Sequence, residues 1–239
     1  MLRVSKVAME RFPEPEIMSN RLQALAYAQA DFDSSDSSFV LELEKYLLRF
    51  SKEIDSKTVI VDLGCGPGNI SERISLRWQE AKVIGIDGSE EMLKIANKRK
   101  SMNQSKNINK GVDYLLMEIS TLNEAFINTK IKADIVVSNS VLHHIHSPNK
   151  FWLTIKKISK PGAITFHRDL RRPSSIREAI ALKKKHLSST SRILQEDYIA
   201  SLKAAYNIEE LKEQLKTLTF QYLEVKELND RYLDVFGIL

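Results

Sequence analysis

The sequence lacks the features that mark several common classes of protein. Its 239 residues include one cysteine, so the chain cannot form an internal disulfide. No apolar run approaches the roughly 20 residues that a helix needs to cross a bilayer. The first residues contain no apolar signal core, and Glu10 and Glu14 argue against a transit peptide. These absences predict a protein of the reducing cytoplasm with no disulfide framework, membrane span or targeting segment.

Glycine is scarce, and three of the 8 glycines stand at the alternating positions 64, 66 and 68. An apolar run at 59–61 precedes them and suits a strand buried on both faces of a parallel sheet. Glycine lets a backbone turn sharply and approach a ligand closely, and the helix that follows would direct its free N–H groups at that ligand. Asp62 ends the strand and faces the same crevice. This stretch predicts a loop that holds a small ligand carrying a carboxylate or a phosphate.

The glycine spacing distinguishes between ligands. Dinucleotide-binding turns follow G-x-G-x-x-G, whereas this turn is G-x-G-x-G and has Asn69 where the third dinucleotide glycine would fall. The Gly-Lys-Ser/Thr of a P-loop is absent. The string Asp-Leu-Gly-Cys-Gly-Pro-Gly at 62–68 resembles the first motif of class I S-adenosylmethionine-dependent methyltransferases. That resemblance implies S-adenosyl-L-methionine as cofactor and S-adenosyl-L-homocysteine as product. Cys65 takes a place in the turn where a small residue is needed, so we do not expect a reactive thiol.

The order of strands and helices predicts the fold class. From residue 58 the two alternate, which favours a doubly wound, mostly parallel α/β sheet with helices on both faces. The resemblance implies a Rossmann-like methyltransferase fold of seven strands, completed by an antiparallel pair at 221–228 and 231–237. Residues 103–109 are predicted as a loop and 160–162 as a turn. The other predicted strands are 58–63, 82–86, 112–117, 133–138 and 163–166, and the helices between them are 67–78, 89–100, 121–128 and 148–158.

The length suits a single domain, 1–239, with four parts. Residues 1–57 form an N-terminal helical cap, with helices at 17–30 and 39–50 and a turn-rich link in which Asp36 or Ser37 caps the second helix. Residues 58–172 form the cofactor-binding core. Residues 173–206 form a helical insertion over the substrate side, with helices at 174–187 and 195–206. Residues 207–239 hold the closing helix, where Asn207 and Glu210 predict a capping box, and the antiparallel strand pair.

The ends of the first strands supply the expected cofactor contacts, because ligands of doubly wound sheets bind at the carboxyl ends of the strands. A carboxylate at Asp87 can accept hydrogen bonds from both ribose hydroxyls, the role that the resemblance implies, although an NAD enzyme would also place an acid there. Glu118 and Ile119 match the family's adenine contacts, but Glu118 could equally be an exposed strand end. Met92 packs on the adenine or in the core. The expected cofactor-binding residues are Asp62, Gly64, Cys65, Gly66, Asp87, Gly88, Ser89, Met92, Glu118, Ile119, Asn139 and Ser140.

Asn139 and Ser140 are followed by Leu-His-His at 142–144, which resembles the small-molecule branch of the family. The chain has neither the Asn-Pro-Pro box of enzymes that methylate exocyclic amines of bases nor the Pro-Cys nucleophile of cytosine C5 enzymes. His144 and His143 are the candidate general bases, with Asp169 behind them. Residues 143, 144 and 146 suggest a metal cluster, but neighbours at this spacing rarely converge on one ion, so we expect no metal.

The sequence predicts fewer contacts on the acceptor side than on the cofactor side. Net charge is +5, and the segment 168–185 has seven basic and two acidic residues. Such a segment is a solvated helix face or a surface for nucleic acid or an anionic substrate. His143, Arg168 and Arg171 are expected to contact the substrate, unless an arginine simply pairs with Asp169. Tyr27 is expected to bind substrate, or else it packs in the core.

The sequence therefore predicts in-line methyl transfer from S-adenosylmethionine to a small-molecule acceptor. Two alternatives stay open: an RNA methyltransferase that uses the basic 168–185 segment, and a non-catalytic protein that binds S-adenosylmethionine. The glycine spacing disfavours an oxidoreductase. The acceptor, the atom that is methylated and the oligomeric state are not specified by the residues.

Overall fold

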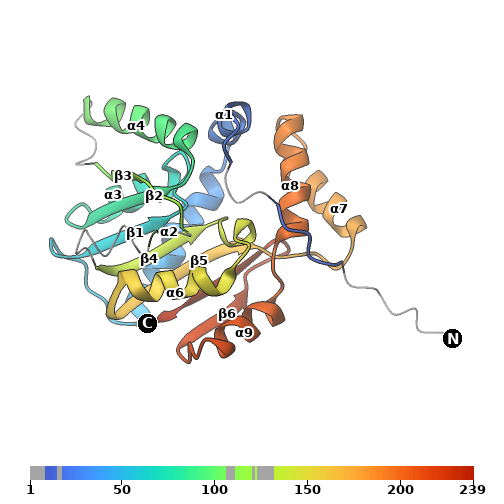
Figure 1. Cartoon of the computed structure of the whole chain (residues 1–239). Helices are drawn as coiled ribbons and strands as arrows, with labels where there is room; N and C mark the ends of the chain where they lie inside the picture. The colour runs from blue at the N-terminus through green and yellow to red at the C-terminus, as the bar shows by residue number, and fades with distance from the viewer. Residues whose placement is uncertain (1–8, 15–17, 106–110, 120–121, 123–131) are drawn as a thin grey trace.

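A single sheet of seven strands lies at the centre of the described structure (Figure 1). The computed structural model describes residues 9–14, 18–105, 111–119, 122 and 132–239. The strand order is β3-β2-β1-β4-β5-β7-β6, and β7 runs antiparallel to both of its neighbours. The chain thus moves outward from β1 in both directions, as the doubly wound prediction requires. The strands are β1 (Val59–Leu63), β2 (Lys82–Asp87), β3 (Asp113–Leu116), β4 (Ala133–Asn139), β5 (Ser159–Leu170), β6 (Leu223–Glu227) and β7 (Tyr232–Ile238).

Helices cover both faces of the sheet and bury two apolar layers. On one face, α2 (Asp33–Arg49) and α3 (Asn69–Arg77) pack through Phe39 and Ile74 against Ile60. On the other, α6 (Pro148–Ile158) and α9 (Ile208–Thr217) share a cluster with Val61 and Leu63. Successive β1 side chains therefore alternate between the two layers, and each side is apolar because each is covered.

A third apolar cluster stands beyond the carboxyl ends of the parallel strands. It joins α7 (Ile176–Leu187) and α8 (Arg192–Ala204) to Leu170, which ends β5, and to Tyr232, which begins the antiparallel β7. Tyr27 packs against the same cluster. In Figure 1, α7 and α8 stand at the right and α1 (Arg21–Gln29) at the top, with α4 (Glu90–Ser105) over the β2 and β3 edge. The N-terminal segment and the insertion thus meet at the edge where a ligand of this fold binds.

Several predictions are confirmed. The helix α6 has the predicted bounds. At the start of α9, Glu210 donates its backbone N–H to the Asn207 side chain at 2.8 Å and its carboxylate accepts the Asn207 N–H at 3.0 Å, which completes the capping box. The closing strands β6 and β7 pair antiparallel. Within the described part of the chain, no helix has the combination of length and apolar character needed to cross a membrane.

Other boundaries differ from the prediction. The helix α2 begins at Asp33, so Asp36 lies buried inside its first turn and the 31–38 link is mostly helical. The helix α4 continues through residue 105, into the predicted loop. The strand β5 runs to Leu170 because β7 pairs with it along 164–170 and holds those residues extended. The predicted 160–162 turn lies inside β5, where the pairing with β4 changes register. The predicted helix at 121–128 falls outside the described residues except for Leu122.

Candidate functional site

The glycine turn after β1 has a backbone that only glycine adopts without strain. Gly64, Gly66 and Gly68 have φ values of 67°, 53° and 88°, all in the left-handed region. The N–H groups of Gly64 and Cys65 both donate to the Ile86 carbonyl, at 2.7 and 3.0 Å, which fixes the turn against β2. A Cβ added at Gly66 would meet no atom within 4 Å, so the turn borders open space. The sequence therefore builds a loop that a ligand can approach along its backbone.

Asp87, at the end of β2, is oriented by two backbone donors. Its Oδ2 accepts the Gly66 N–H at 2.8 Å and its Oδ1 accepts the Ser89 N–H at 2.7 Å. Burial raises the pKa of this carboxyl, and the two donated hydrogen bonds oppose that rise. Each carboxylate oxygen retains a further lone pair, which suits a ligand with two neighbouring hydroxyl groups.

Asp62 lies below the turn and is 1% exposed. Its Oδ2 accepts a hydrogen bond from the Ser71 hydroxyl at 2.6 Å, and burial raises its pKa to about 7. Burial also raises the pKa of the Cys65 thiol well above its usual value, because a thiolate there would lose its hydration. Asp62 thus supports the turn, and Cys65 stays a neutral thiol.

These groups surround a cavity that we call the glycine-loop recess. Side chains and backbone from the ends of β1, β2, β3 and β4 meet there, although their segments are separate in the sequence. Of the expected cofactor-binding residues, Ser89 alone is not on the wall: it is buried and its hydroxyl donates to the Met18 carbonyl at 2.7 Å. The expected residues that line the recess are Asp62, Gly64, Cys65, Gly66, Asp87, Gly88, Met92, Glu118, Ile119, Asn139 and Ser140.

A second cavity, the histidine recess, adjoins the first. It lies between the strand ends and the α7–α8 cluster and is lined by His143 and His144. Ser140 has φ of 58°, which is uncommon for a residue other than glycine, and its N–H donates to the Arg168 carbonyl at 2.8 Å. Backbone strain of this kind concentrates at functional sites. The residues that line both recesses are Met18, Tyr27, Asp36, Asn139, Ser140 and His144.

His143 and His144 form the short helix η1 (Leu142–His144) with Leu142. Asp169 holds His143 from two directions: its Oδ1 is 2.5 Å from Nδ1, and its Oδ2 accepts the backbone N–H at 2.9 Å. Burial by itself would lower the pKa of His143, but the carboxylates of Asp169 and Glu14 outweigh it and raise that pKa. His143 is 2% exposed, whereas His144 lies on the walls of both recesses.

Glu14 is a site residue that sequence reasoning missed. Its Oε1 lies 3.4 Å from His143 Nε2 and 3.4 Å from His144 Nδ1, and it has no hydrogen-bond partner among the described atoms. Burial raises the pKa of Glu14. These three ligand atoms lie within 4.8 Å of one another, so this is where the described residues could share a metal ion. The expectation of no metal stays a prediction.

The position of Glu14 depends on tertiary contacts of residues 9–14, which no sequence pattern predicts. Arg11 donates from Nε to the Ala204 carbonyl at 2.6 Å and from Nη2 to the His143 carbonyl at 3.2 Å. Its guanidinium also stacks 4.0 Å from the centre of the Tyr206 ring. The segment is therefore tied to both η1 and the end of α8, and it carries Glu14 over the histidines.

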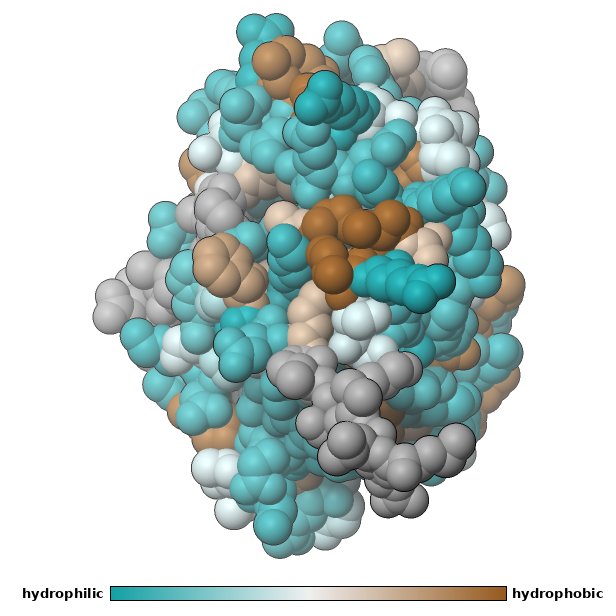
Figure 2. Space-filling model, turned by 90° about the vertical axis from the view of Figure 1, so that its right-hand side faces the viewer, coloured by the Kyte–Doolittle hydropathy of each residue, from teal (hydrophilic) through white to brown (hydrophobic). Residues whose placement is uncertain are grey.

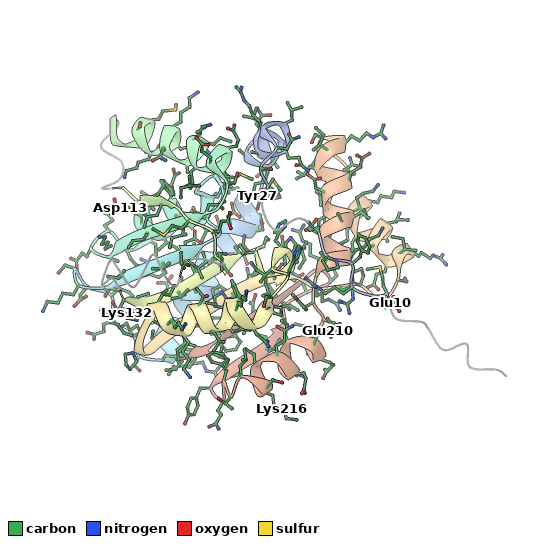
Figure 3. All side chains as sticks on the ribbon, viewed as in Figure 1. Glu10, Tyr27, Asp113, Lys132, Glu210 and Lys216 are labelled. Carbon is green, nitrogen blue, oxygen red and sulfur yellow. The ribbon has the colours of Figure 1, made fainter. Side chains whose placement is uncertain are left out.

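The expected substrate residues separate into two groups. Tyr27, labelled in Figure 3, belongs to α1 and lines both recesses. Arg168 and Arg171 line neither. Arg168 is buried and its guanidinium donates to both Asp234 oxygens, at 2.8 and 2.9 Å, so its acid partner is Asp234 rather than Asp169. Arg171 lies 3.3 Å from Glu227 at the edge of the sheet.

The basic 168–185 segment is largely neutralised by the chain itself. Figure 2 looks onto the α7 and α8 side and shows an apolar patch surrounded by hydrophilic surface; Ile176 and Ile180 are exposed apolar residues of α7. Four of the seven basic side chains form ion pairs with acids elsewhere in the chain: Arg168 with Asp234, Arg171 with Glu227, Arg172 with Glu210 and Lys185 with Asp230.

Comparison with known sequences identifies the domain. The sequence model of a methyltransferase domain matches residues 54–227. Trans-aconitate 2-methyltransferase of Afipia carboxidovorans is 55% identical over 40 residues, which are 17% of this chain and 16% of that protein. An uncharacterized methyltransferase of Schizosaccharomyces pombe is 32% identical over 119 residues, 49% of this chain and 40% of that protein. The chain thus matches less than half the length of these curated relatives.

Solved structures show the same fold. The plantazolicin methyltransferase BpumL, crystallised with a pentazolic desmethylPZN analogue and S-adenosylhomocysteine, superposes with a TM-score of 0.68 at 18% identity, covering 91% of this chain and 90% of that one. An S-adenosylmethionine-dependent methyltransferase of Aquifex aeolicus gives a TM-score of 0.55 at 18% identity, covering 82% and 88%. At these identities the likeness concerns the fold alone.

Proposed function

This chain belongs to the methyltransferase domain family, and from that premise we propose that it transfers a methyl group from S-adenosylmethionine to a small-molecule acceptor. The donor occupies the glycine-loop recess and the acceptor the histidine recess. The observation that carries the proposal is that the two cavities share the Asn139–Ser140 wall and His144, so that a donor and an acceptor can meet there.

Each wall of the glycine-loop recess binds a different part of the donor. The glycine turn and the N-terminus of α3 face the carboxylate of the donor, since free N–H groups and the helix dipole favour an anion. Asp87 accepts hydrogen bonds from the ribose hydroxyls, while Glu118, Ile119 and Met92 surround the adenine. The sulfonium of S-adenosylmethionine supplies an already activated methyl group. The protein therefore mainly has to align the acceptor with it and exclude water.

A base is required where the acceptor must lose a proton. His144 is suited to this because it lines both recesses and its Nδ1 lies 3.4 Å from Oε1 of Glu14, a carboxylate that can orient the ring. His143 and Asp169 form a buried pair behind it. In this proposal His144 contacts the acceptor, and Asp169 and Glu14 orient the imidazoles in the way that a carboxylate orients a catalytic histidine.

The alternatives receive less support from the site. An RNA methyltransferase would need the 168–185 segment to face a nucleic acid, yet four of its basic side chains form ion pairs within the chain. A non-catalytic binding protein would not require an acceptor cavity joined to the donor cavity. The proposal places the enzyme in the cytoplasm, the reducing compartment that a lone, buried cysteine suits.

Calorimetry with S-adenosylmethionine and two tryptophan variants tests the donor site. Gly66→Trp fills the open space beside the turn and is expected to abolish the micromolar binding expected of the unmodified protein. Gly162→Trp is the matched control. Gly162 also has a left-handed φ, 76°, and open space at its Cβ, but it lies near the start of β5, at the opposite end of the strands from the glycine turn. Binding by Gly66→Trp equal to that of the unmodified protein would overturn the assignment.

A further inference from the structure

The histidine recess has mainly apolar and aromatic walls. The α7–α8 cluster contributes Leu187, Leu194 and Tyr198, and the segment around α1 contributes Tyr27 and Phe32, whose ring centroids lie 4.9 Å apart. Leu170 and Tyr232 complete the same surface. Aromatic walls favour a flat apolar ligand, because rings offer a large contact area in offset or tilted packing.

Acidic side chains outnumber lysine and arginine around this recess. Asp36 and Asp197 are on its wall, and Glu14 and Asp169 lie directly against the histidines. Among the described lining residues, Arg231 is the only lysine or arginine, and its guanidinium is positioned 4.6 Å from the centre of the Tyr232 ring. A ligand with several carboxylates would face these acids with one guanidinium to pair with, and an unpaired buried charge is costly.

One polar group on the wall lacks a partner of good geometry. The Tyr198 hydroxyl is buried and makes no well-formed hydrogen bond to any described atom, and the Arg231 guanidinium is the cation nearest to act on it. A buried hydroxyl without a partner is destabilising, so such groups usually bind a ligand or water. Tyr198 is therefore placed to bind one polar group of a molecule whose body contacts the apolar walls.

We propose that the acceptor is a small molecule with an apolar, ring-bearing body, no carboxylate, and one nucleophilic hydroxyl or amine. This inference rests on the proposed function. The nucleophile lies at Asn139, Ser140 and His144, and a second polar group of the acceptor bonds the Tyr198 hydroxyl. This class differs from trans-aconitate, a tricarboxylate for which some relatives are named.

Methyl transfer in this arrangement is an in-line displacement at the methyl carbon. The lone pair of the acceptor oxygen or nitrogen forms the new bond to the methyl carbon, and the carbon–sulfur bond breaks with its electron pair staying on sulfur. The proton of the acceptor moves to the imidazole of His144. The products are the methylated acceptor and S-adenosylhomocysteine, and no oxidant or further reactant is needed.

A paired assay tests the acceptor class. The purified chain receives methyl-labelled S-adenosylmethionine with 4-propylphenol, 4-propylaniline or trans-aconitate, and labelled product is measured. We expect a rate at least tenfold higher with a ring-bearing probe than with trans-aconitate. Tyr198→Phe removes the buried hydroxyl and is expected to raise KM about tenfold for a probe with a second polar group, such as 4-(3-hydroxypropyl)phenol, with little change in kcat. Tyr222→Phe, at a tyrosine 74% exposed, should change neither.

The outcomes separate this inference from the proposed function. Calorimetry with S-adenosylmethionine is run on the same preparation. If the donor binds and trans-aconitate is methylated in preference, or if no ring-bearing probe is methylated, the acceptor class is wrong while the donor site stands. If the donor does not bind, the proposed function itself fails.

Discussion

The two recesses are built in opposite ways. The glycine-loop recess is made at the ends of consecutive β-strands, and each of its main groups belongs to a short stretch of sequence with its own backbone constraint, such as the left-handed glycines. The histidine recess is assembled from distant segments: the 27–32 segment, η1, the end of β5 and the helices α7 and α8. The main groups of the donor side come from short local motifs that the parallel strands bring together, whereas the acceptor side depends on packing between distant segments.

The donor side is therefore less sensitive to substitution than the acceptor side. A loop fixed by backbone geometry and hydrogen bonds to the next strand keeps its shape when surface side chains change. Walls formed by the side chains of α7, α8 and the N-terminal segment change with each substitution. The fold can therefore hold the donor side constant while the acceptor side varies, as expected of a scaffold that carries many functions.

The largest expected effect comes from Arg168, which sequence reasoning placed on the acceptor side. Arg168→Met leaves the fully buried Asp234 carboxylate without its partner, so we expect a loss of about 3–5 kcal/mol in the free energy of unfolding. Urea denaturation measures it. The double variant Arg168→Met, Asp234→Leu is expected to recover most of the loss, since no unpaired charge is then buried. An unchanged stability together with a raised KM for the acceptor would mean that Arg168 contacts the acceptor.

Arg168 and Glu14 show why the acceptor side could not be predicted from the sequence. The local pattern of residues 167–170 predicts the end of a strand. Pairing with β7 extends β5 instead and turns Arg168 toward Asp234, which is 66 residues later in the chain. Glu14 stands in a segment without periodicity, and its position depends on Arg11 contacts to η1 and α8. By contrast, Asp87 and Gly66 could be predicted because parallel strands bring their ends to one edge.

On the donor side, Asp62→Asn is expected to change the pH dependence of stability. The folded pKa of Asp62 is about 7, above the ordinary 3.8, so the folded state keeps a proton that the unfolded chain releases. Stability of the unmodified protein is therefore lost as pH rises from about 4 to about 7, by at most about 4 kcal/mol at about 1.4 kcal/mol per pKa unit. Asparagine cannot ionise and still accepts the Ser71 hydroxyl, so the variant should lack this loss.

Denaturation of the ligand-free protein between pH 4 and pH 8 measures the effect of Asp62. The control is Asp113→Asn, at an exposed aspartate labelled in Figure 3. An Asp62→Asn profile that runs parallel to that of the unmodified protein would show that the carboxyl is ionised in the folded state and that the turn has another support.

A smaller effect is expected at Glu14, which we regard as a positioning residue. Glu14→Gln keeps the shape of the side chain but removes the charge beside the His143 and His144 nitrogens, so we expect kcat to fall about tenfold, the size of one charge-assisted hydrogen bond. KM and the donor Kd should stay unchanged, because Glu14 is on the wall of neither recess. Steady-state kinetics with a ring-bearing acceptor measures both constants.

Three controls sharpen the Glu14 result. Glu10→Gln, at an exposed glutamate on the same segment (Figure 3), should retain full activity. Glu14→Asp keeps the charge and should recover part of kcat. Dialysis of the unmodified protein against EDTA should leave kcat unchanged, whereas a loss that added zinc restores would mean that Glu14 and the histidines hold a metal. A raised KM with constant kcat would mean that Glu14 contacts the acceptor.

The smallest effect is expected on α7, where the basic segment could still favour a nucleic acid. Arg177 and Lys184 are exposed and two helical turns apart, so Arg177→Glu, Lys184→Glu reverses two charges on one face. Exposed substitutions away from a site usually change stability by less than about 0.5 kcal/mol, and we expect kcat/KM for a small acceptor to stay within about twofold. An RNA methyltransferase would behave differently, because phosphate contacts make binding steeply dependent on salt and charge. A tenfold loss of RNA binding, with loss of label transferred to RNA, would mean that the acceptor is an RNA bound on the surface of α7 and not a small molecule in the histidine recess.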